Sequence, residues 1–344
     1  MKTVRIAIIG CGGISDKHAM AIRQTPETQL TACYSEPRES AEKFAQAWEI
    51  KAFDSYGALL SSQDIDAVSI CTPSGLHTPQ ALEAIRHGKH VLLEKPMSLT
   101  LEEADSLIDA ANRSRVKVGI VSQYRFSPAV LEIGRAIEAG ALGKITSGSL
   151  QMKYYRSPAY YASGAWRGTW KLDGGGALMN QGIHGVDIFR SLMGTPKTLT
   201  GFARTQVHAI EVEDSAVAVL EFESGALGTL EGSTACYPGY PRRLEICGDK
   251  GSVVLEEDAI IRWDIDMPCR LPVGHPAKDV ASSDPMAISL DGHIRHYVNF
   301  AGAILRDEPL LEDAQAGRLP LEVILAVYLS SQSGKSIDMG TLRR

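Results

Sequence analysis

The sequence has no long apolar run, no paired-cysteine motif and no excess of basic residues. No stretch of about 18 consecutive apolar residues occurs in the 344-residue chain, so no segment is predicted to span a membrane. The formal net charge of −6 leaves no basic footprint for phosphates, which argues against a nucleic-acid partner. The first ten residues, MKTVRIAIIG, run directly into a glycine-rich turn without a cleavage signal, so they are predicted to form a strand and not a signal peptide.

The six cysteines are scattered through the chain, with no Cys-x-x-Cys pair. This pattern favours neither a metal site nor a disulfide framework, and it is typical of a protein of the reducing cytoplasm. The chain is 44% hydrophobic and 22% charged, as in ordinary soluble globular proteins. Its length is sufficient for two hydrophobic cores. We therefore predict a cytoplasmic protein of two domains.

Short apolar runs alternate with helical patterns over the first 121 residues. The apolar runs are Val4–Ile9, Leu30–Tyr34, Ala67–Cys71, His90–Glu94 and Val116–Val121. The helical patterns between them are Asp16–Thr25, Arg38–Trp48, Pro79–His87 and Leu101–Arg113. Strands that alternate with helices form right-handed βαβ units, in which a parallel sheet is buried on both faces. We therefore predict a doubly wound α/β domain over residues 1–121.

After residue 121, polar and apolar residues alternate over longer stretches. These stretches are Lys144–Tyr154, Leu199–His208, Ser215–Glu223, Leu227–Cys236 and Arg243–Cys247. Such alternation is typical of an open antiparallel sheet with one face in solvent. Two helices are predicted to follow, over Ile294–Leu305 and Ala314–Ser333. Residues 122–344 are therefore predicted to form a second domain of mixed α and β structure.

The sequence GCGGIS follows the first predicted strand and opens the first predicted helix. Its residues are Gly10, Cys11, Gly12, Gly13, Ile14 and Ser15, a GxGxxG pattern with serine in the last position. Glycines at these positions let the backbone approach a pyrophosphate, whose charge lies at the positive N-terminus of the helix. The alternative is an ordinary tight turn. The context favours a bound dinucleotide.

The end of the second predicted strand bears on the choice between NAD and NADP. An acidic residue there would bind the 2′-hydroxyl of the adenosine ribose of NAD. The chain has Ser35 at this position, which would not repel a 2′-phosphate, and Arg38 could pair with that phosphate. Glu36 could serve NAD instead, and Arg38 could be a solvated charge. The pattern favours NADP slightly and leaves NAD open.

Three further motifs accompany the glycine-rich turn. Residues 71–77 read CTPSGLH, residues 88–96 read GKHVLLEKP, and residues 173–187 read DGGGALMNQGIHGVD. With these motifs the chain resembles the glucose-fructose oxidoreductase/inositol dehydrogenase/rhizopine catabolism (Gfo/Idh/MocA) family over essentially its whole length. The resemblance implies an N-terminal Rossmann domain and a C-terminal α/β domain, whose large, mostly antiparallel sheet often makes oligomer contacts. It also implies NAD(P)-dependent oxidation or reduction of a sugar, cyclitol or related polyol.

The resemblance also assigns cofactor contacts. By resemblance, the loop over the nicotinamide half of the cofactor and its neighbouring strand end contain Cys71, Thr72, Pro73, His77 and Glu94. For His77, a surface histidine on a plain turn is the alternative. Gln123, Tyr124 and Arg125 stand where the chain crosses between the predicted domains, so their polar groups could reach cofactor and substrate. The family often has Asn-Arg-Arg-Phe here, and Gln123 and Tyr124 depart from that pattern.

Lys95 follows a predicted parallel strand at its carboxyl end, where ligands bind in doubly wound sheets. Pro96 favours an extended conformation of Lys95. In a half-dry pocket beside a cationic nicotinamide, the pKa of Lys95 should fall, which would let it exchange a proton near neutrality. The alternative is a solvated surface charge. We predict that Lys95 contacts both cofactor and substrate and takes part in catalysis.

Asn180, His184 and Asp187 are spaced i, i+4 and i+7 in a helix predicted over Ala177–Leu192, so they share one face. Oxidation of an alcohol needs a base for the hydroxyl proton, and the ordinary pKa of histidine suits that task. The alternative for His184 is an interfacial histidine with satisfied hydrogen bonds. Asparagine is a poor metal ligand and no other ligand cluster supports a metal, so none is predicted.

The family pattern at this helix is usually Asp-x-x-x-His, which matches Asn180 and His184 except that an amide replaces the carboxylate. An amide can orient a hydroxyl or an imidazole, but it carries no proton at neutral pH. We therefore predict that His184 and Lys95 share the proton transfer and that Asn180 positions the substrate. Gly182 and Gly185 are expected to permit close packing on the opposite face of the helix.

A segment rich in aromatic residues and arginine precedes this helix. Trp166 and Arg167 suit the C–H faces and the hydroxyls or carboxylates of sugars, although a loop held by buried tryptophan is the alternative. His293 is a further candidate for substrate contact. The predicted partners are therefore a small sugar or polyol substrate and a second copy of this chain, in a dimer or tetramer formed through the C-terminal sheet.

Two other functions remain open on this scaffold. One is a glycosidase that uses tightly held NAD for a transient oxidation, and the other is a non-catalytic sensor that binds a dinucleotide. Net turnover of the cofactor separates the dehydrogenase from the glycosidase. An intact Lys95 and His184 weigh against the sensor.

Overall fold

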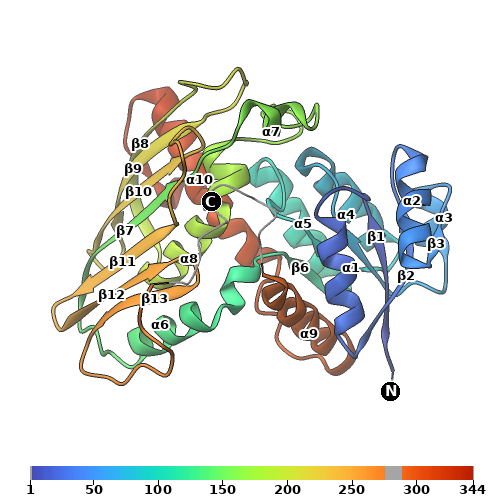
Figure 1. Ribbon diagram of the computed structural model, residues 1–344, viewed down its shortest axis with the longest axis horizontal. Coiled ribbons are helices and arrows are strands. Elements are labelled where there is room, and N and C mark those ends of the chain that lie inside the picture. The colour runs from blue at the N-terminus through green and yellow to red at the C-terminus, as the bar shows by residue number, and fades with distance from the viewer. Residues whose placement is uncertain (1, 276–288, 344) are drawn as a thin grey trace. The chain divides into compact units, whose positions relative to one another are not determined.

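A computed structural model describes residues 2–275 and 289–343 of the chain (Figure 1). The chain divides into two compact units. Unit 1 contains residues 1–123 and 289–318, and unit 2 contains residues 124–288 and 319–344. In the described part of the chain, no helix has the length and the apolar character needed to cross a membrane.

Unit 1 is built on a six-stranded parallel sheet in the order β3-β2-β1-β4-β5-β6. Its strands are β1 (Val4–Ile9), β2 (Thr28–Tyr34), β3 (Lys51–Ala52), β4 (Ala67–Ile70), β5 (His90–Leu93) and β6 (Val118–Ile120). Its helices are α1 (Ser15–Gln24), α2 (Arg38–Trp48), α3 (Tyr56–Ser61), α4 (His77–Arg86), α5 (Leu101–Arg113) and α9 (Leu290–Arg306), with a short 3-10 turn η1 (Ser74–Leu76). This strand order is that of a dinucleotide-binding Rossmann fold and confirms the predicted doubly wound domain.

Helix α9 belongs to unit 1, although the sequence prediction assigned residues 122–344 to the second domain. Tyr297, Phe300 and Ala301 of α9 are fully buried and join the same apolar core as Ile6 and Ile8 of β1. The chain returns to unit 1 because this apolar face completes a core formed by residues almost 300 positions earlier. The break after residue 123 lies close to the expected boundary at residue 121.

Unit 2 contains an eight-stranded sheet in the order β13-β12-β11-β7-β10-β9-β8-β14. Its strands are β7 (Ile145–Lys153), β8 (Pro196–Arg204), β9 (Ser215–Phe222), β10 (Leu227–Ser233), β11 (Arg243–Gly248), β12 (Gly251–Glu256), β13 (Ala259–Asp264) and β14 (Ile337–Asp338). All neighbouring pairs are antiparallel except β7 and β10, which run parallel. The predicted large, mostly antiparallel sheet is confirmed, and β12 and β13 extend it beyond the stretches found in the sequence.

One face of this sheet is buried and the other is open, as the alternation of residues predicts. Helix α8 (Ile183–Met193) packs on the inner face, where Phe189 meets Phe222 of β9 edge-on at 5.8 Å between ring centroids. On the outer face, Val219 and Leu227 are 59% and 62% exposed. Among the described residues, four further helical segments lie in unit 2: α6 (Pro128–Glu138), α7 (Pro158–Ala162), η3 (Ala177–Gly182) and η4 (Met339–Leu342). The segments η2 (Gln123–Phe126) and α10 (Ala314–Ser333) contain residues of both units.

The helix predicted over residues 177–192 has two parts. Ala177–Gly182 forms a π-helical turn, and α8 begins at Ile183. The wider turn arises because the N–H groups of both Asn180 and Gln181 donate to the carbonyl oxygen of Gly176, each at 3.2 Å. Asn180 and His184 therefore do not stack with regular α-helical spacing. Such π turns are frequent at functional sites.

Candidate functional site

In unit 1, the turn that follows β1 has a backbone that only glycine permits at its first position. Gly10 has φ +89°, and a Cβ atom there would lie 2.8 Å from Cγ2 of Thr72. At Gly12, a Cβ atom would meet nothing within 4 Å, so the space in front of this residue is open. Ser15 is fully buried at the start of α1 and donates its hydroxyl to the carbonyl oxygen of Gly12 at 2.5 Å. The turn therefore packs closely against Thr72 at Gly10 and faces open space at Gly12.

The backbone N–H groups of this turn fit an anionic ligand. Cys11 N–H donates to the hydroxyl of Ser35 at 3.1 Å, which places the predicted residue Ser35 at the turn. Among the described residues, the N–H groups of Gly12, Gly13 and Ile14 have no hydrogen-bond partner. Unpaired N–H groups at the start of a helix favour a phosphate. The observation supports the predicted dinucleotide site.

Arg38, the candidate partner for a 2′-phosphate, lies at the start of α2 with 65% of its side chain exposed. Its guanidinium group pairs with Glu42 at 2.7 Å and with Asp54 at 2.9 Å. These two carboxylates already neutralise the charge that a 2′-phosphate would use. Arg38 therefore gives NADP less support than the sequence suggested.

His77 is buried and connects two loops, whereas the sequence left a surface position open. Its Nδ1 lies 2.7 Å from the carbonyl oxygen of Pro96, and its Nε2 lies 2.9 Å from that of Thr72. Burial is the main cause that lowers the pKa of His77 below its ordinary value. Its position joins the loop of residues 71–77 to the EKP motif, both of which the resemblance assigns to the cofactor.

Two further candidates of unit 1 lie in its interior. Gln123 is 4% exposed, and its Oε1 has no hydrogen-bond partner among the described residues. His293, the candidate substrate contact, is 1% exposed and meets the ring of His18 edge-on at 5.3 Å between centroids. The structure thus places His293 beside Glu94 and His18 rather than in unit 2.

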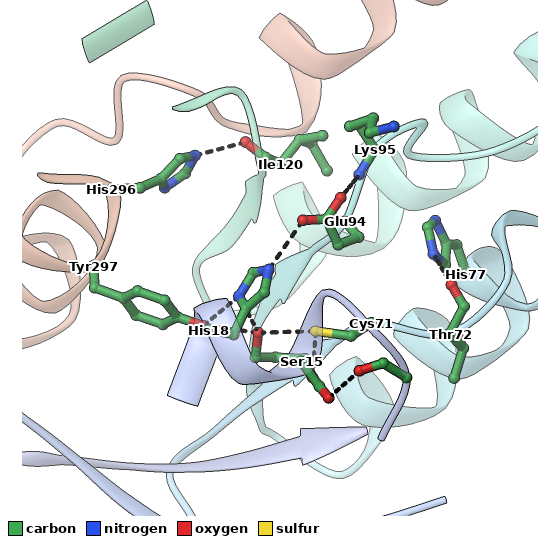
Figure 2. A network of polar contacts seen from close by, with 12 residues as sticks. Ser15, His18, Cys71, Thr72, His77, Glu94, Lys95, Ile120, His296 and Tyr297 are labelled. Carbon is green, nitrogen blue, oxygen red and sulfur yellow. Dashed lines mark hydrogen bonds and ion pairs between the residues drawn. The ribbon is translucent and has the colours of Figure 1, made fainter. Parts of the chain in front are cut away.

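Figure 2 shows the polar network around Glu94, whose carboxylate contacts His18 on one side and Lys95 on the other. Nε2 of His18 lies 2.9 Å from Oε1 of Glu94, and the N–H of Lys95 donates to Oε2 of Glu94 at 3.1 Å. Lys95 follows the carboxyl end of β5, as predicted. Behind His18, its Nδ1 lies 2.7 Å from the hydroxyl of Tyr297 and 3.1 Å from that of Ser69.

The electrostatics of this network favour an ion pair. Burial alone would raise the pKa of Glu94, but the hydrogen bond and the charge of His18 lower it well below its usual range. Burial alone would lower the pKa of His18, yet Cys71, Tyr297 and Glu94 raise it well above its ordinary value. Burial and the charge of His18 lower the pKa of His293 to about 3. One carboxylate is therefore balanced by one charged histidine, and the second histidine is neutral.

His18, Glu94 and His293 are also residue types that bind metals, and their ligand atoms lie within 4.8 Å of one another. Both ring nitrogens of His18, however, already have partners in the chain, and both oxygens of Glu94 are hydrogen-bonded. An ion would have to replace these bonds. The arrangement is explained by the ion pair alone.

In unit 2, the three consecutive glycines at 174–176 lead into a helical turn whose first N–H groups bind a carboxylate of the chain itself. The carboxylate of Glu213 accepts the N–H groups of Gly176 at 2.9 Å and Leu178 at 2.8 Å, and the hydroxyl of Tyr328 at 2.8 Å. The N–H of Ala177 donates to the backbone carbonyl of the same Glu213 at 3.0 Å. The anion site at the start of this helical segment is therefore occupied by Glu213.

Asn180 belongs to a chain of hydrogen bonds. Its Nδ2 donates to Oδ1 of the buried Asp173, and its Oδ1 accepts from Nε2 of Gln181 at 3.1 Å. Gln181 also donates to the hydroxyl of Tyr160 at 2.6 Å. A carboxylate is thus present next to Asn180, although it comes from Asp173, the first residue of the glycine motif.

His184 lies at the start of α8, half-buried, with its ring edge-on to Tyr124 at 5.3 Å between centroids. Tyr124 in turn lies under the guanidinium group of the buried Arg242, at 4.4 Å. Arg125 pairs with Asp187 at 3.3 Å. Unit 2 therefore brings the predicted residues of segment 124–125 to α8.

Arg167 donates to the hydroxyl of Tyr160, and its guanidinium group lies over the rings of Tyr160 at 4.3 Å and Trp166 at 4.5 Å. The segment thus joins Arg167 to the chain of hydrogen bonds that includes Asn180, through Tyr160 and Gln181.

Gly182 and Gly185 pack against β7, as predicted. A Cβ atom at Gly185 would lie 2.5 Å from Sδ of Met152, and one at Gly182 would lie 3.0 Å from Cε of the same residue. The two glycines therefore let the helical segment approach the sheet.

Comparison with known proteins identifies the family. Residues 4–122 match the model of the oxidoreductase family with an NAD-binding Rossmann fold, and residues 130–254 match the GFO/IDH/MocA C-terminal domain. The crystal structure of the WlbA dehydrogenase from Bordetella pertussis, in complex with NADH and UDP-GlcNAcA, is 30% identical and has a TM-score of 0.88. The alignment covers 98% of this chain and 99% of that one. The chain belongs to the Gfo/Idh/MocA family.

Curated relatives of this Gfo/Idh/MocA protein are dehydrogenases. The scyllo-inositol 2-dehydrogenase (NAD(+)) of Bacillus subtilis is 29% identical over 265 residues, which cover 73% of each chain. The D-apiose dehydrogenase of Paraburkholderia graminis is 27% identical over 353 residues, covering 99% of this chain and 91% of that one. The chain is therefore an NAD-binding oxidoreductase, as the resemblance implied.

Several residues of the polar networks in the two units were not identified from the sequence. They are His18, Ser69 and Tyr297 in unit 1, and Asp173 and Glu213 in unit 2. His18 had a local signal, because a histidine on the apolar face of α1 is buried and needs a partner. Glu213 and Tyr297 had none, because their partners lie 35 or more positions away in the chain.

Proposed function

We propose that this protein interconverts a hydroxyl and a carbonyl group on a sugar, cyclitol or related polyol. The observation that carries the proposal is that unit 1 contains both features of such an enzyme. The N–H groups of residues 12–14 have no partner among the described residues, and Lys95 follows the carboxyl end of β5. The names of the relatives, which act on inositol and apiose, support the substrate class.

In the proposed mechanism the nicotinamide supplies the hydride acceptor or donor. When an alcohol is oxidised, its hydroxyl proton goes to His184 or Lys95 as the carbon loses hydride, and the reverse supplies that proton in reduction. Asn180 orients the substrate, because its amide cannot carry the proton and its Nδ2 is already bonded to Asp173. Trp166, Arg167, Tyr124 and Arg125 are proposed substrate contacts.

For the cofactor, we propose that NAD(H) is used at least as well as NADP(H). The NADH in the WlbA structure supports NAD, and the pairing of Arg38 with Glu42 and Asp54 weakens the argument for NADP. The ratio of kcat/KM for the two cofactors tests this. An Arg38→Ala variant should change that ratio by less than about 3-fold if NAD is the cofactor, and should reduce NADP use by about 10-fold or more if Arg38 binds the 2′-phosphate.

The decisive experiment is a panel of polyols, aldoses, sugar acids and a UDP-sugar acid, run with NAD and NADP in parallel. The absorbance of the reduced nicotinamide reports turnover. Net reduction of cofactor with at least one alcohol supports the dehydrogenase. Consumption of a glycoside without net change in cofactor would indicate the NAD-dependent glycosidase, and cofactor binding without turnover of any compound would indicate a sensor.

We also propose that the protein works in the cytoplasm as a dimer or tetramer, formed through the outer face of the unit 2 sheet. That face exposes Phe202, Val217, Val219 and Leu227, a set of apolar side chains on β8, β9 and β10. A contiguous apolar face of this kind favours association. Sedimentation of the wild type and of a Val219→Glu variant tests the proposal, since the substitution should release monomers.

A further inference from the structure

The backbone of Lys95 is held from both sides by buried histidines. On its N-terminal side, the carboxylate of Glu94 bridges the N–H of Lys95 and the ring of His18. On its C-terminal side, the carbonyl oxygen of Pro96 contacts His77. His18 belongs to helix α1, which begins at the cofactor turn, so it connects that helix to the strand end where Lys95 lies (Figure 2).

We propose that His18 is a positioning residue for Lys95 and acts through Glu94. The inference rests on the proposed role of Lys95 in the reaction. Glu94 uses both of its oxygens inside the chain, one on His18 and one on Lys95. If Oε1 lost its partner, the carboxylate could rotate toward other donors, and Oε2 would no longer be fixed against the N–H of Lys95.

The hydrogen-bond directions support a charged, fixed His18. Glu94 accepts only, so the Nε2 of His18 donates to it. The hydroxyl of Tyr297 donates to Ser69 at 2.8 Å, which leaves its oxygen to accept from Nδ1 of His18 at 2.7 Å. This arrangement is compatible with an imidazolium, in which both ring nitrogens donate, and it agrees with the raised pKa of His18. A charge-assisted bond to Glu94 fixes the carboxylate more firmly than a neutral one would.

The residues that hold His18 on the side away from Glu94 are buried. His18 and Tyr297 are both fully buried, and Ser69 is fully buried in β4, next to β5 in the sheet. Tyr297 comes from α9, which the chain adds to unit 1 from residues 289–318. The return of the chain to unit 1 therefore completes the support of Lys95.

The test combines exchange of the Lys95 amide with steady-state kinetics on the full-length protein. His18→Leu removes the donor to Glu94, whereas His18→Gln keeps an amide N–H near the position of Nε2. Tyr297→Phe loosens His18 without touching Glu94, and it remains informative if His18→Leu does not fold. His90→Asn, at the amino end of the same strand, is the matched control, because His90 contacts the N–H of Lys117 and not Glu94.

Hydrogen–deuterium exchange of the Lys95 amide should become about 10-fold faster in His18→Leu and a few-fold faster in Tyr297→Phe. The amide of Val91, bonded to the carbonyl of Lys117 at 2.9 Å, should exchange at the wild-type rate. The turnover number should fall about 10- to 100-fold in His18→Leu, because small displacements of a reacting group have effects of that size. KM for the cofactor should change by less than about 3-fold, and His18→Gln should recover most of the turnover.

Two results would overturn the proposal. One is a Lys95 amide that exchanges at the wild-type rate in folded His18→Leu or Tyr297→Phe. The other is faster exchange of that amide with unchanged kcat, which would make His18 a purely structural residue. Failure of the proposed function is seen separately, since it concerns turnover by the wild type, whereas amide exchange needs no substrate.

Discussion

Two glycine-rich turns open helical segments in this protein, one in each unit, and they use glycine differently. At residues 10–15 the N–H groups of Gly12, Gly13 and Ile14 have no partner among the described residues. At residues 176–178 the three successive N–H groups all donate to oxygens of Glu213. The first turn can therefore accept an external anion, whereas the second carries its own. A glycine cluster before a helix indicates a possible anion site, and only its surroundings decide what fills it.

The polar contacts around Lys95 in unit 1 and around Asn180 in unit 2 also differ in kind. Around Lys95, the contacts are an ion pair and its buried supports, with little freedom to rearrange. Around Asn180, the contacts are amides and hydroxyls, with Asp173 as the acid. The surroundings of Lys95 are therefore held by an ion pair, whereas those of Asn180 are held mostly by neutral hydrogen bonds.

The largest expected effect concerns the two residues that we propose to transfer the proton, one in each unit. Lys95→Met and His184→Ala should each lower kcat by roughly 10³-fold, about 4 kcal/mol in activation free energy, because each removes a group that exchanges a proton. Cofactor affinity, measured by fluorescence titration, should change far less than kcat. Unchanged turnover in either variant would remove that residue from the proposed mechanism.

The two glycine turns can be compared directly by adding one methyl group to each. In Gly176→Ala the new Cβ would lie 2.1 Å from the backbone oxygen of Glu213, so the free energy of unfolding should fall by about 3 kcal/mol. In Gly12→Ala the methyl group meets nothing within 4 Å, so stability should stay within about 0.5 kcal/mol. Gly12→Ala should instead weaken cofactor binding. Denaturant unfolding and cofactor titration check the pair, and equal stability losses would contradict the comparison.

A smaller effect is expected from exchanging the amide and the acid of unit 2. Asn180→Asp places a second carboxyl group in contact with Asp173, so the pKa of one of the two should rise. We expect kcat to fall about 10-fold at neutral pH and the pH–rate profile to gain a new limb. The double variant Asn180→Asp/Asp173→Asn restores one acid and one amide, and it should recover most of the loss. An unchanged profile in the single variant would indicate that Asn180 is structural.

The last expected effect concerns the acid stability of unit 1 and involves no proposed site residue. Burial is the main cause that lowers the pKa of His296 to about 4, whereas the unfolded chain has an ordinary histidine pKa near 6.5. Between these values the unfolded state binds more protons, so the free energy of unfolding should decrease as the pH falls through this window. In His296→Gln that pH dependence should be shallower by about 1.4 kcal/mol per pH unit. Denaturant unfolding at several pH values measures it, and an unchanged slope would contradict the buried neutral state.

Much of the fold could be predicted because the information is local. The helices Arg38–Trp48, Leu101–Arg113 and Ala314–Ser333 begin and end at the predicted residues, and in the first two the amphipathic periodicity is strong. Strands β12 and β13, of six residues each, were not predicted. The π turn at Ala177–Gly182 was also missed, because it depends on the shared carbonyl of Gly176 and on packing against β7.

The sequence alone determined the alternating order of strands and helices, the dinucleotide turn and the family, because periodicity and short motifs depend on neighbouring residues. The tertiary structure alone decided that α9 joins unit 1, that Glu213 fills the second glycine turn, and that His18 and Tyr297 support Glu94 behind Lys95. These contacts join residues from about 35 to almost 280 positions apart. They form because buried polar groups must find partners wherever the fold brings them, and no local pattern records which partner that is.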